Sequence, residues 1–218
     1  HISTSVGGDT ITTANGDDVV NSGDGNDLVN VGAGNDTANG EGGIDRISAD
    51  LSTDSAGINW NLQTNSYSGA LGSFTNFEFF GTVTTGSGDD AITTGSGARN
   101  EVVNTGAGAD SVSIYGGSDA VNLGAGVDTI VIDWSDLTTA AYNNTGRRAN
   151  GTEGGFDGGF YGNDGRNVSY TSADHFHITT GSGNDTITTM SGDDIVHAGA
   201  GDDVVDVGIF ALPYGNGV

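Results

Sequence analysis

Residues 4–48 divide into five consecutive units of nine residues with nothing left over. In one-letter code the units read TSVGGDTIT, TANGDDVVN, SGDGNDLVN, VGAGNDTAN and GEGGIDRIS. Every unit has glycine at position four, aspartate at position six and an apolar residue at position eight. A unit this short cannot bury its own apolar face, so it has to stack on its neighbours. The period therefore predicts an all-β solenoid rather than a globule built around one central core.

The same period returns twice further along the chain. A second array covers residues 85–131 with the units TGSGDDAIT, TGSGARNEVVN, TGAGADSVS, IYGGSDAVN and LGAGVDTIV. Its second unit holds two extra residues and has Glu101 at position six, and whether Glu101 acts as the aspartates do is left open. A third array begins at Thr180 and reads TGSGNDTIT, TMSGDDIVH and AGAGDDVVD. The close of the first array at residues 45–52 recurs 83 residues later at 128–135, so a larger repeat overlies the short one.

Two segments without the nine-residue period separate the arrays. Alternation from Ile58 to Leu62 predicts a strand in the first, where Trp60 and nearby phenylalanines would fill a widened core. The low-complexity run 149–162 in the second predicts an exposed loop. We predict one continuous elongated domain with this order: array one at 4–52, an irregular solenoid insert at 53–84, array two at 85–135, a Gly-rich insert with strands at 136–179, array three at 180–206 and a tail at 207–218.

Each unit combines a glycine-rich hexamer with a three-residue strand. Glycine permits positive φ and keeps Cβ atoms out of a crowded loop. Side chains alternate along a strand, so position eight faces inward while positions seven and nine face outward. Two units then form one coil of 18 residues, and two parallel sheets enclose a thin core. Position-six carboxylates of successive coils are predicted to stack in the pairs 9/27, 18/36, 27/45, 101/119, 110/128 and 185/203, with 90/110 across the insertion.

Stacked carboxylates repel one another unless a cation lies between them. Strands one rung apart are separated by about 4.8 Å, and the chain carries a net charge of −24 with no lysine and five arginines. Ca²⁺ is a hard cation that takes about 6–8 oxygen ligands, whereas Mg²⁺ demands a tighter octahedron. The alternative is that Asp and Gly are only turn formers. Turn formation alone would accept Asn or Ser at position six, so calcium is the favoured interpretation.

The G-x-D-x-U part of these units resembles the RTX nonapeptide, the hemolysin-type calcium-binding repeat G-G-x-G-x-D-x-U-x. The first glycines of that consensus are often replaced here. The resemblance covers the three arrays and implies a right-handed parallel β-roll or β-helix that holds about seven or more Ca²⁺ ions. Position five is expected to form hydrogen bonds within the loops rather than to ligate. The expected ligand positions are Asp9, Asp18, Asp27, Asp36, Asp45, Asp90, Asp110, Asp119, Asp128, Asp185, Asp194 and Asp203, with the loop glycines Gly7, Gly16, Gly25, Gly34, Gly88, Gly108, Gly126, Gly183, Gly192 and Gly201.

Composition and motifs exclude several other functions. An acidic chain is a poor partner for nucleic acid, because phosphate binding depends on Lys and Arg. No apolar run reaches the length of a membrane span, and cysteine is absent. We find no zinc-protease motif and no nucleophile elbow, and no lysine is available for a phosphate loop. No catalytic residues are therefore predicted, and the chain is not expected to be an enzyme.

Three weaker candidates remain beside calcium. His175 and His177 lie two apart on a predicted strand and could suit a transition metal, but an ordinary strand pair is favoured. Scattered Thr pairs could form an ice-binding ladder, which we judge too irregular. Aromatic residues could form a sugar-stacking platform, although core packing is favoured for all of them: Trp60, Trp134, Tyr161 and Tyr170.

The resemblance also implies a location and a role. RTX proteins typically leave Gram-negative cells by type I secretion, so an extracellular or cell-surface protein is expected. The chain starts at His1 and its end does not supply a convincing secretion signal, which favours a fragment of a longer protein. We expect calcium-driven folding and a structural or adhesive role, as in a surface layer or a large adhesin. The alternatives are a folding and secretion module of a secreted protease, lipase or alginate epimerase, or a carbohydrate-binding module; cell-surface polysaccharide and self-association are the candidate partners besides calcium.

Overall fold

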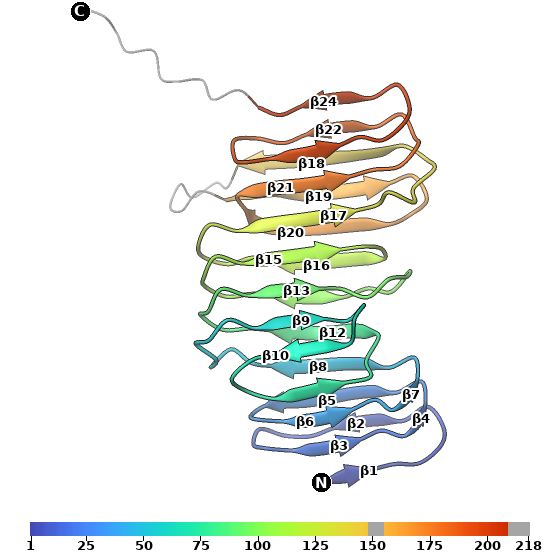
Figure 1. The fold of residues 1–218 in the computed structure, drawn as a ribbon, viewed down its shortest axis with the longest axis vertical. Helices are drawn as coiled ribbons and strands as arrows, with labels where there is room; N and C mark the ends of the chain where they lie inside the picture. The colour runs from blue at the N-terminus through green and yellow to red at the C-terminus, as the bar shows by residue number, and fades with distance from the viewer. Residues whose placement is uncertain (148–154, 209–218) are drawn as a thin grey trace, which may run out of the picture.

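The computed structural model describes residues 1–147 and 155–208. Within these residues the protein contains 24 β-strands and no helix. The strands lie across the long axis of the molecule and follow one another along it from the N-terminus to the C-terminus (Figure 1). Across the described residues, no helix has the length and apolarity needed to cross a membrane. The prediction of an all-β chain is confirmed.

The largest sheet has eleven strands in the order β2-β5-β8-β12-β14-β16-β20-β19-β18-β22-β24. All its neighbours pair in parallel except β20 with β19 and β19 with β18, which are antiparallel. Its strands are β2 (Thr10–Thr12), β5 (Leu28–Ala33), β8 (Arg46–Asp50), β12 (Phe79–Thr84), β14 (Val102–Asn104), β16 (Ser118–Asn122), β18 (Ala141–Arg147), β19 (Phe156–Gly162), β20 (Asn167–Ala173), β22 (Thr186–Thr188) and β24 (Val204–Asp206).

Three further sheets complete the stack, in the orders β10-β9-β13-β15-β17-β21-β23, β1-β3-β6-β11 and β4-β7. Only the pair β10 and β9 is antiparallel among them. Their strands are β1 (Ile2–Ser3), β3 (Val19–Asn21), β4 (Asp24–Gly25), β6 (Thr37–Asn39), β7 (Gly42–Gly43), β9 (Asn59–Asn61), β10 (Ser66–Ser68), β11 (Ser73–Thr75), β13 (Ala91–Thr93), β15 (Ser111–Ile114), β17 (Thr129–Asp133), β21 (His175–Thr179) and β23 (Ile195–His197).

The register within the arrays follows the predicted 18-residue coil. Val29 of β5 pairs with Ile11 of β2 and with Ile47 of β8, and each partner lies 18 residues away. Position eight forms the core as expected in the first two arrays and at Ile187, because side chains that alternate along a strand place every second residue inside. In the last two units Val196 is only partly buried and Val205 is 43% exposed. The buried position-eight residues are Ile11, Val20, Val29, Ala38, Ile47, Ile92, Val103, Val112, Val121, Ile130 and Ile187. This arrangement is consistent with a β-roll.

A second inward-facing row lies at position one of the units, which the sequence analysis did not identify. Some of its members are apolar and buried, such as Val31, Ile114 and Leu123. Others are threonines whose hydroxyls donate to the position-one carbonyl oxygen one coil later. Thr13 Oγ1 donates to Val31 O at 2.8 Å, and Thr105 Oγ1 donates to Leu123 O at 2.8 Å. Threonine can occupy this row because the neighbouring coil supplies an acceptor for its hydroxyl.

The first insert joins the stack through aromatic packing. The predicted strand around Trp60 is present as β9, which pairs in parallel with β13 and aligns Trp60 with Ile92. The Trp60 ring stacks on Phe74 with 4.5 Å between ring centroids and 13° between ring planes. Phe74, Phe77 and Trp60 are all at most 2% exposed, so this insert widens the core as the sequence predicted.

The second insert differs from the expected exposed loop. Its residues 149–154 lie outside the described part of the chain, as do residues 209–218 of the predicted tail. The remainder of the run forms β19, which lies between β18 and β20 in the eleven-stranded sheet. Phe156 and Phe160 are 5% and 1% exposed because their four-residue spacing places both on one face of the strand. The Gly-rich run 149–162 therefore contains two phenylalanines that belong to the core, which its low-complexity composition did not indicate.

Candidate metal centre

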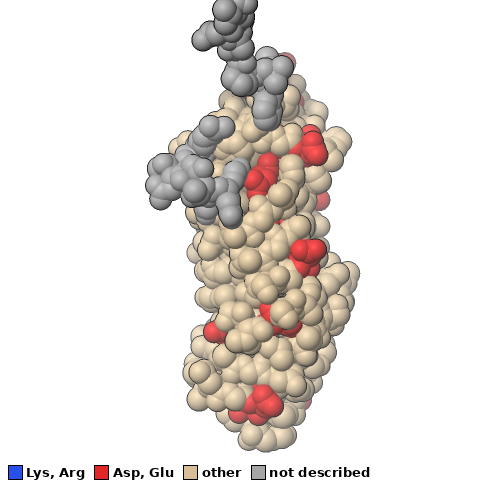
Figure 2. All heavy atoms as spheres, turned by 90° about the vertical axis from the view of Figure 1, so that its left-hand side faces the viewer, with Lys and Arg blue, Asp and Glu red and all other residues tan. Residues whose placement is uncertain are grey.

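The predicted aspartates line the edges of the stack, each two residues before an inward-facing strand residue. Eight of the twelve are at most 3% exposed: Asp27, Asp36, Asp45, Asp90, Asp110, Asp119, Asp128 and Asp185. The other four are Asp9, Asp18, Asp194 and Asp203, which occupy the terminal coils and are only partly buried. On the side of the molecule shown in Figure 2, Asp and Glu side chains reach the surface only in separate small patches. The eight buried position-six aspartates therefore lie beneath the surface, whereas acids such as Asp17, Asp89 and Asp202 are exposed.

One oxygen of each stacked aspartate accepts a hydrogen bond from the preceding coil. The backbone N–H of Asp27 donates to Asp45 Oδ1 at 2.8 Å, and the N–H of Asp110 donates to Asp128 Oδ1 at 2.9 Å. All seven predicted pairs are brought into contact in this way, at 2.8–2.9 Å: 9/27, 18/36, 27/45, 90/110, 101/119, 110/128 and 185/203. The carboxylates thus form continuous ladders along the edges of the stack.

The second oxygen of most of these carboxylates has no partner. The atoms concerned are buried and accept no hydrogen bond: Oδ2 of Asp27, Asp36, Asp45, Asp110, Asp119, Asp128, Asp185 and Asp194. A buried polar atom without a partner costs free energy, and a buried charge costs more. An array of such oxygens, one per coil, is the donor set that a hard divalent cation prefers. These residues therefore fit Ca²⁺.

Burial raises the pKa of these carboxyl groups. It raises the pKa of Asp119 to about 7 and, with repulsion from neighbouring carboxylates, raises the pKa of Asp110 and of Asp128 to about 6. It also raises the pKa of Asp36 and of Asp90 above the ordinary value. In the metal-free ladder these carboxyl groups therefore hold their protons to higher pH than ordinary aspartates, and a bound cation would favour the ionised form.

The loop glycines bring backbone oxygens close to the carboxylates. A Cβ added to Gly34 would lie 2.4 Å from Gly16 O and 3.2 Å from Asp36 Oδ1, and one added to Gly126 would lie 1.6 Å from Gly108 O. The space that these glycines leave empty is thus bordered by oxygens of two successive coils. φ is positive at seven of the predicted glycines: Gly7, Gly16, Gly25, Gly34, Gly108, Gly126 and Gly201.

The three remaining predicted glycines are required for close approach rather than for positive φ. They are Gly88, Gly183 and Gly192, whose added Cβ atoms would each lie 2.3 Å from a backbone atom of the preceding coil. No group of three or more His, Cys, Asp or Glu side chains in the described residues could hold a metal ion. Any ion in the ladders would therefore need backbone carbonyl oxygens in addition to a pair of carboxylates.

Four position-five side chains accept hydrogen bonds that link the loops, as predicted: Asp17, Asn26, Asp89 and Asn184. The Oδ1 atom of Asp17 accepts the N–H of Asn35 at 3.0 Å, and that of Asp89 accepts the N–H of Ala109 at 2.8 Å. Asn26 and Asn184 do the same at 3.0 Å. The position-five side chains accept hydrogen bonds from the following coil, whereas the position-six carboxylates accept them from the preceding coil. Each pair of neighbouring loops is therefore linked by side-chain acceptors from both loops.

Glu101 occupies the aspartate position of the irregular unit. It is 1% exposed, and its Oε1 accepts the N–H groups of Phe80 at 2.8 Å and Gly95 at 3.3 Å. Burial, together with the charge of Asp119, raises the pKa of Glu101 to about 8. The two-residue insertion therefore keeps a carboxyl group in the ladder, and its role as a ligand stays a prediction.

Two carboxylates in the ladders were missed by the sequence analysis. The N–H of Asp45 donates to Glu78 Oε2 at 2.7 Å, and the N–H of Asp128 donates to Asp174 Oδ2 at 3.0 Å. Both residues lie in the inserts, outside the nine-residue period. The available signal was an acidic residue two positions before a buried phenylalanine, Phe80 in one case and Phe176 in the other.

The weaker candidates have structural roles or remain untested. His175 Nδ1 accepts the N–H of Asp193 at 2.7 Å, so this histidine joins two loops. The rings of Trp60, Trp134 and Tyr170 are at most 2% exposed, so they belong to the core rather than to a sugar platform. Tyr161 is partly exposed and stacks on Tyr142 with 5.4 Å between ring centroids.

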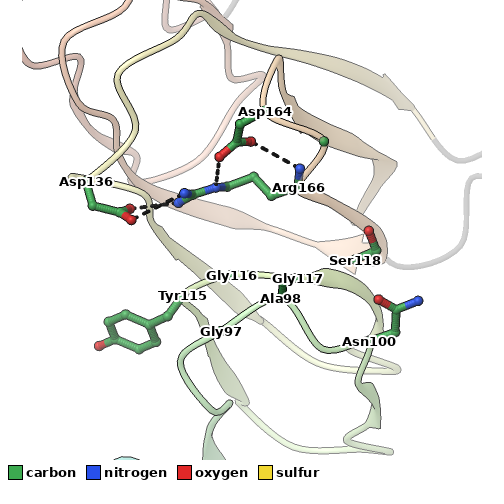
Figure 3. A pocket seen from close by; sticks show the side chains of 11 residues that line it. Gly97, Ala98, Asn100, Tyr115, Gly116, Gly117, Ser118, Asp136, Asp164 and Arg166 are labelled. Carbon is green, nitrogen blue, oxygen red and sulfur yellow. Dashed lines mark hydrogen bonds and ion pairs between the residues drawn. The ribbon is translucent and has the colours of Figure 1, made fainter.

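A pocket of about 440 Å³ lies beside the second insert, and Figure 3 shows its lining. Arg166 donates from Nη1 to Asp136 Oδ1 at 2.7 Å and from Nε to Asp164 Oδ2 at 2.8 Å. Its guanidinium also lies 5.6 Å from the ring centroid of Trp134. Arg166 lowers the pKa of Asp136 through this hydrogen bond. The Arg166 guanidinium is therefore engaged by two carboxylates of the insert and by the Trp134 ring, so the pocket does not present it to a ligand.

Comparison with protein families finds four copies of the RTX calcium-binding nonapeptide repeat, at residues 3–38, 30–55, 96–130 and 177–210. A search of curated proteins finds no match. The four copies coincide with the coils that carry the carboxylate ladders, and together they span more than half of the chain. The protein belongs to the family of RTX calcium-binding nonapeptide repeat proteins.

Proposed function

We propose that this chain is a right-handed β-roll of a secreted or cell-surface protein and that calcium drives its folding. The observation that carries the proposal is the row of buried carboxylate oxygens without partners, repeated along both edges of the stack. The position-six aspartates and the carbonyl oxygens of the loop glycines would hold the ions. Calcium bound there would neutralise the ladders and connect successive coils.

The charge of the chain makes folding depend on cations. Seven ions in the seven stacked pairs would contribute 14 positive charges against a net charge of −24. Because the unfolded chain does not offer preformed sites, calcium would stabilise the folded state by linkage. Extracellular calcium modules bind at about 10⁻⁴–10⁻³ M. The chain would stay unfolded in a cytosol with little free calcium and fold after export by type I secretion.

The role that we favour is structural or adhesive, as a rigid segment of a surface layer or a large adhesin. Both inserts support this role, because they contribute buried strands and aromatic side chains to the rod. A C-terminal folding and secretion module of a secreted protease, lipase or alginate epimerase is the second candidate, and the repeats suit it equally. We propose that the chain itself carries no catalytic activity, and that polysaccharide or a second copy is its partner besides calcium.

Circular dichroism during a calcium titration tests the proposal. In excess EGTA at pH 7.5 we expect a largely unfolded spectrum, and β structure should appear cooperatively as Ca²⁺ rises through the millimolar range. Mg²⁺ at the same concentrations serves as the control and should not induce folding. A chain that keeps its full β signal in EGTA would contradict calcium-driven folding.

A further inference from the structure

Two acidic residues of the inserts, Glu78 and Asp174, each occupy the place of a position-six aspartate. Phe79 and Phe80 of β12 pair with Arg46 and Ile47 of β8, so Glu78 lies one coil beyond Asp45 in register. The N–H of Asp45 donates to Glu78 Oε2 at 2.7 Å, as each array aspartate donates to the next. Glu78 thus continues the ladder of array one into the first insert.

The second insert repeats this arrangement. His175 and Phe176 of β21 pair with Thr129 and Ile130 of β17, which places Asp174 one coil beyond Asp128. The N–H of Asp128 donates to Asp174 Oδ2 at 3.0 Å across 46 residues of sequence. Arrays one and two therefore each end on an aspartate whose stacked partner is a carboxylate of the following insert.

Each of these two carboxylates is preceded by a residue with positive φ. Asn76 and Ser172 precede Glu78 and Asp174 by two residues, the place that position-four glycine holds in a repeat. Their φ angles are +57° and +65°, a region that residues other than glycine rarely adopt. The position-four glycines have larger φ values, such as +122° at Gly16 and +149° at Gly126, so the junctions share a positive φ with the repeats but not the same backbone conformation.

Where an insert is followed by an array, the stacked residues are not a pair of carboxylates. At the start of arrays two and three the residues stacked before Asp90 and Asp185 are Ile58 and Ala141, whose N–H groups donate to the aspartates at 2.8 and 2.7 Å. The hydrogen bond of the ladder is therefore formed without a second carboxylate. Since the backbone contact does not need an acid on both coils, Glu78 and Asp174 call for a different explanation.

The array side of each junction holds an oxygen that lacks a partner. Asp45 is 1% exposed and Asp128 is 0% exposed, and Oδ2 of each accepts no hydrogen bond. At the first junction a Cβ added to Gly40 would lie 2.7 Å from Asp45 Oδ2 and 2.0 Å from the carbonyl oxygen of Asn76. The free carboxylate oxygen and a backbone oxygen of the insert thus border the same small space.

We propose that Glu78 and Asp174 are calcium ligands that pair with Asp45 and Asp128, so that a calcium ion joins each insert to the array before it. This inference rests on the proposed function, because it extends the calcium ladders beyond the repeats. It adds two ions to those of the seven array pairs. The inserts then fold only when calcium is bound, together with the arrays that they follow.

Calorimetric Ca²⁺ titration of the whole chain and of Glu78→Gln and Asp174→Asn tests the proposal. Both amides keep an oxygen for the stacked N–H while removing the charge. We expect each variant to bind one ion fewer than the wild type and the double variant two fewer. Glu41→Gln and Asp202→Asn serve as matched controls, because both acids are exposed in loops, and they should keep the full number of ions.

Hydrogen exchange at saturating Ca²⁺ supplies a second readout. Glu78→Gln should raise amide exchange in residues 53–84, and Asp174→Asn in residues 155–179, while the other insert stays protected. If a variant does not fold, Glu78→Asp or Asp174→Glu should restore folding and the lost ion, and failure of both acidic replacements would overturn the proposal. An unchanged ion number in both amide variants would also overturn it while leaving the array sites standing. A wild-type chain that binds no calcium would instead overturn the proposed function.

Discussion

Asp110 donates its backbone N–H to Oδ1 of Asp128 at 2.9 Å, while Oδ2 of Asp128 is buried and has no partner. The two oxygens of the Asp128 carboxylate thus have different roles. Its first oxygen fixes the spacing of successive coils through a backbone contact, and its second oxygen is held in place for a cation. Because the first contact positions the second oxygen, stacking of the coils and placement of the cation-binding oxygens occur together.

Position in the ladder should determine how many ions a substitution removes. Asp27 lies between Asp9 and Asp45, so it borders two stacked pairs, whereas Asp203 borders only the pair with Asp185. We expect Asp27→Ala to remove two Ca²⁺ ions and Asp203→Ala to remove one, as counted by calorimetric titration. Equal losses, or no loss in either variant, would contradict the stacked scheme.

The metal-free protein should fold better in acid than at neutral pH. Burial raises the pKa of Asp45, Asp110 and Asp128 from 3.8 to about 6. A group whose pKa is higher in the folded state makes that state bind more protons, so its contribution is complete below about pH 4 and is lost as pH rises through about 6. In EGTA we expect more β structure at pH 5 than at pH 8 by circular dichroism.

Calcium should reverse this pH dependence, which provides the control for the acid experiment. Protons compete with Ca²⁺ for the same oxygens, so the midpoint of calcium-induced folding should move to higher calcium concentration as pH falls from 8 to 5. A metal-free β signal that increases with pH would show that the raised pKa values do not govern folding.

The nine-residue period predicted the fold correctly in the arrays, where the same residue types recur at the same positions of each unit. Glycine at position four, aspartate at six and an apolar residue at eight repeat often enough that strand, turn and stacking partner follow together. The pair 27/45 could therefore be placed from sequence alone, and its backbone contact is 2.8 Å long. Glu101 shows the same robustness, since a two-residue insertion leaves its carboxyl group in the ladder.

Features without the period could not be placed in the same way. Glu78 and Asp174 lack the preceding glycine, and their stacked partners lie 33 and 46 residues away rather than 18. Thr105 looks like a surface residue of a strand, yet its hydroxyl is buried because Leu123 O accepts it one coil later. These positions depend on tertiary neighbours, which no spacing along the chain reveals.

Replacing a position-four glycine should destabilise the protein more where the neighbouring coil is close than where only the positive φ is at stake. Gly126 and Gly16 both have positive φ, at +149° and +122°, but a Cβ on Gly126 would lie 1.6 Å from Gly108 O and one on Gly16 would meet nothing within 4 Å. We expect Gly16→Ala to lower the free energy of unfolding by about 1–2 kcal/mol, the cost of a left-handed conformation. Gly126→Ala should add an overpacking cost of about 1–3 kcal/mol. Thermal unfolding at saturating Ca²⁺ measures both, and equal losses would contradict the role of crowding.

The buried hydroxyls at position one should contribute modestly to stability without affecting calcium. Thr105→Val removes the hydrogen bond to Leu123 O but keeps the shape of the side chain, and Val31 already fills the same position in another coil. The net worth of one such bond is about 0.5–1.5 kcal/mol, so a decrease of that size in the free energy of unfolding is expected at saturating Ca²⁺. The hydroxyl also contacts the Asp110 carboxyl group, where it partly offsets the rise in that group's pKa. The number of bound ions should nevertheless stay that of the wild type, because Val31 fills this position in the unit that carries the predicted ligand Asp36. A loss of ions in Thr105→Val would contradict this prediction, because it would show that the hydroxyl contributes to the metal site.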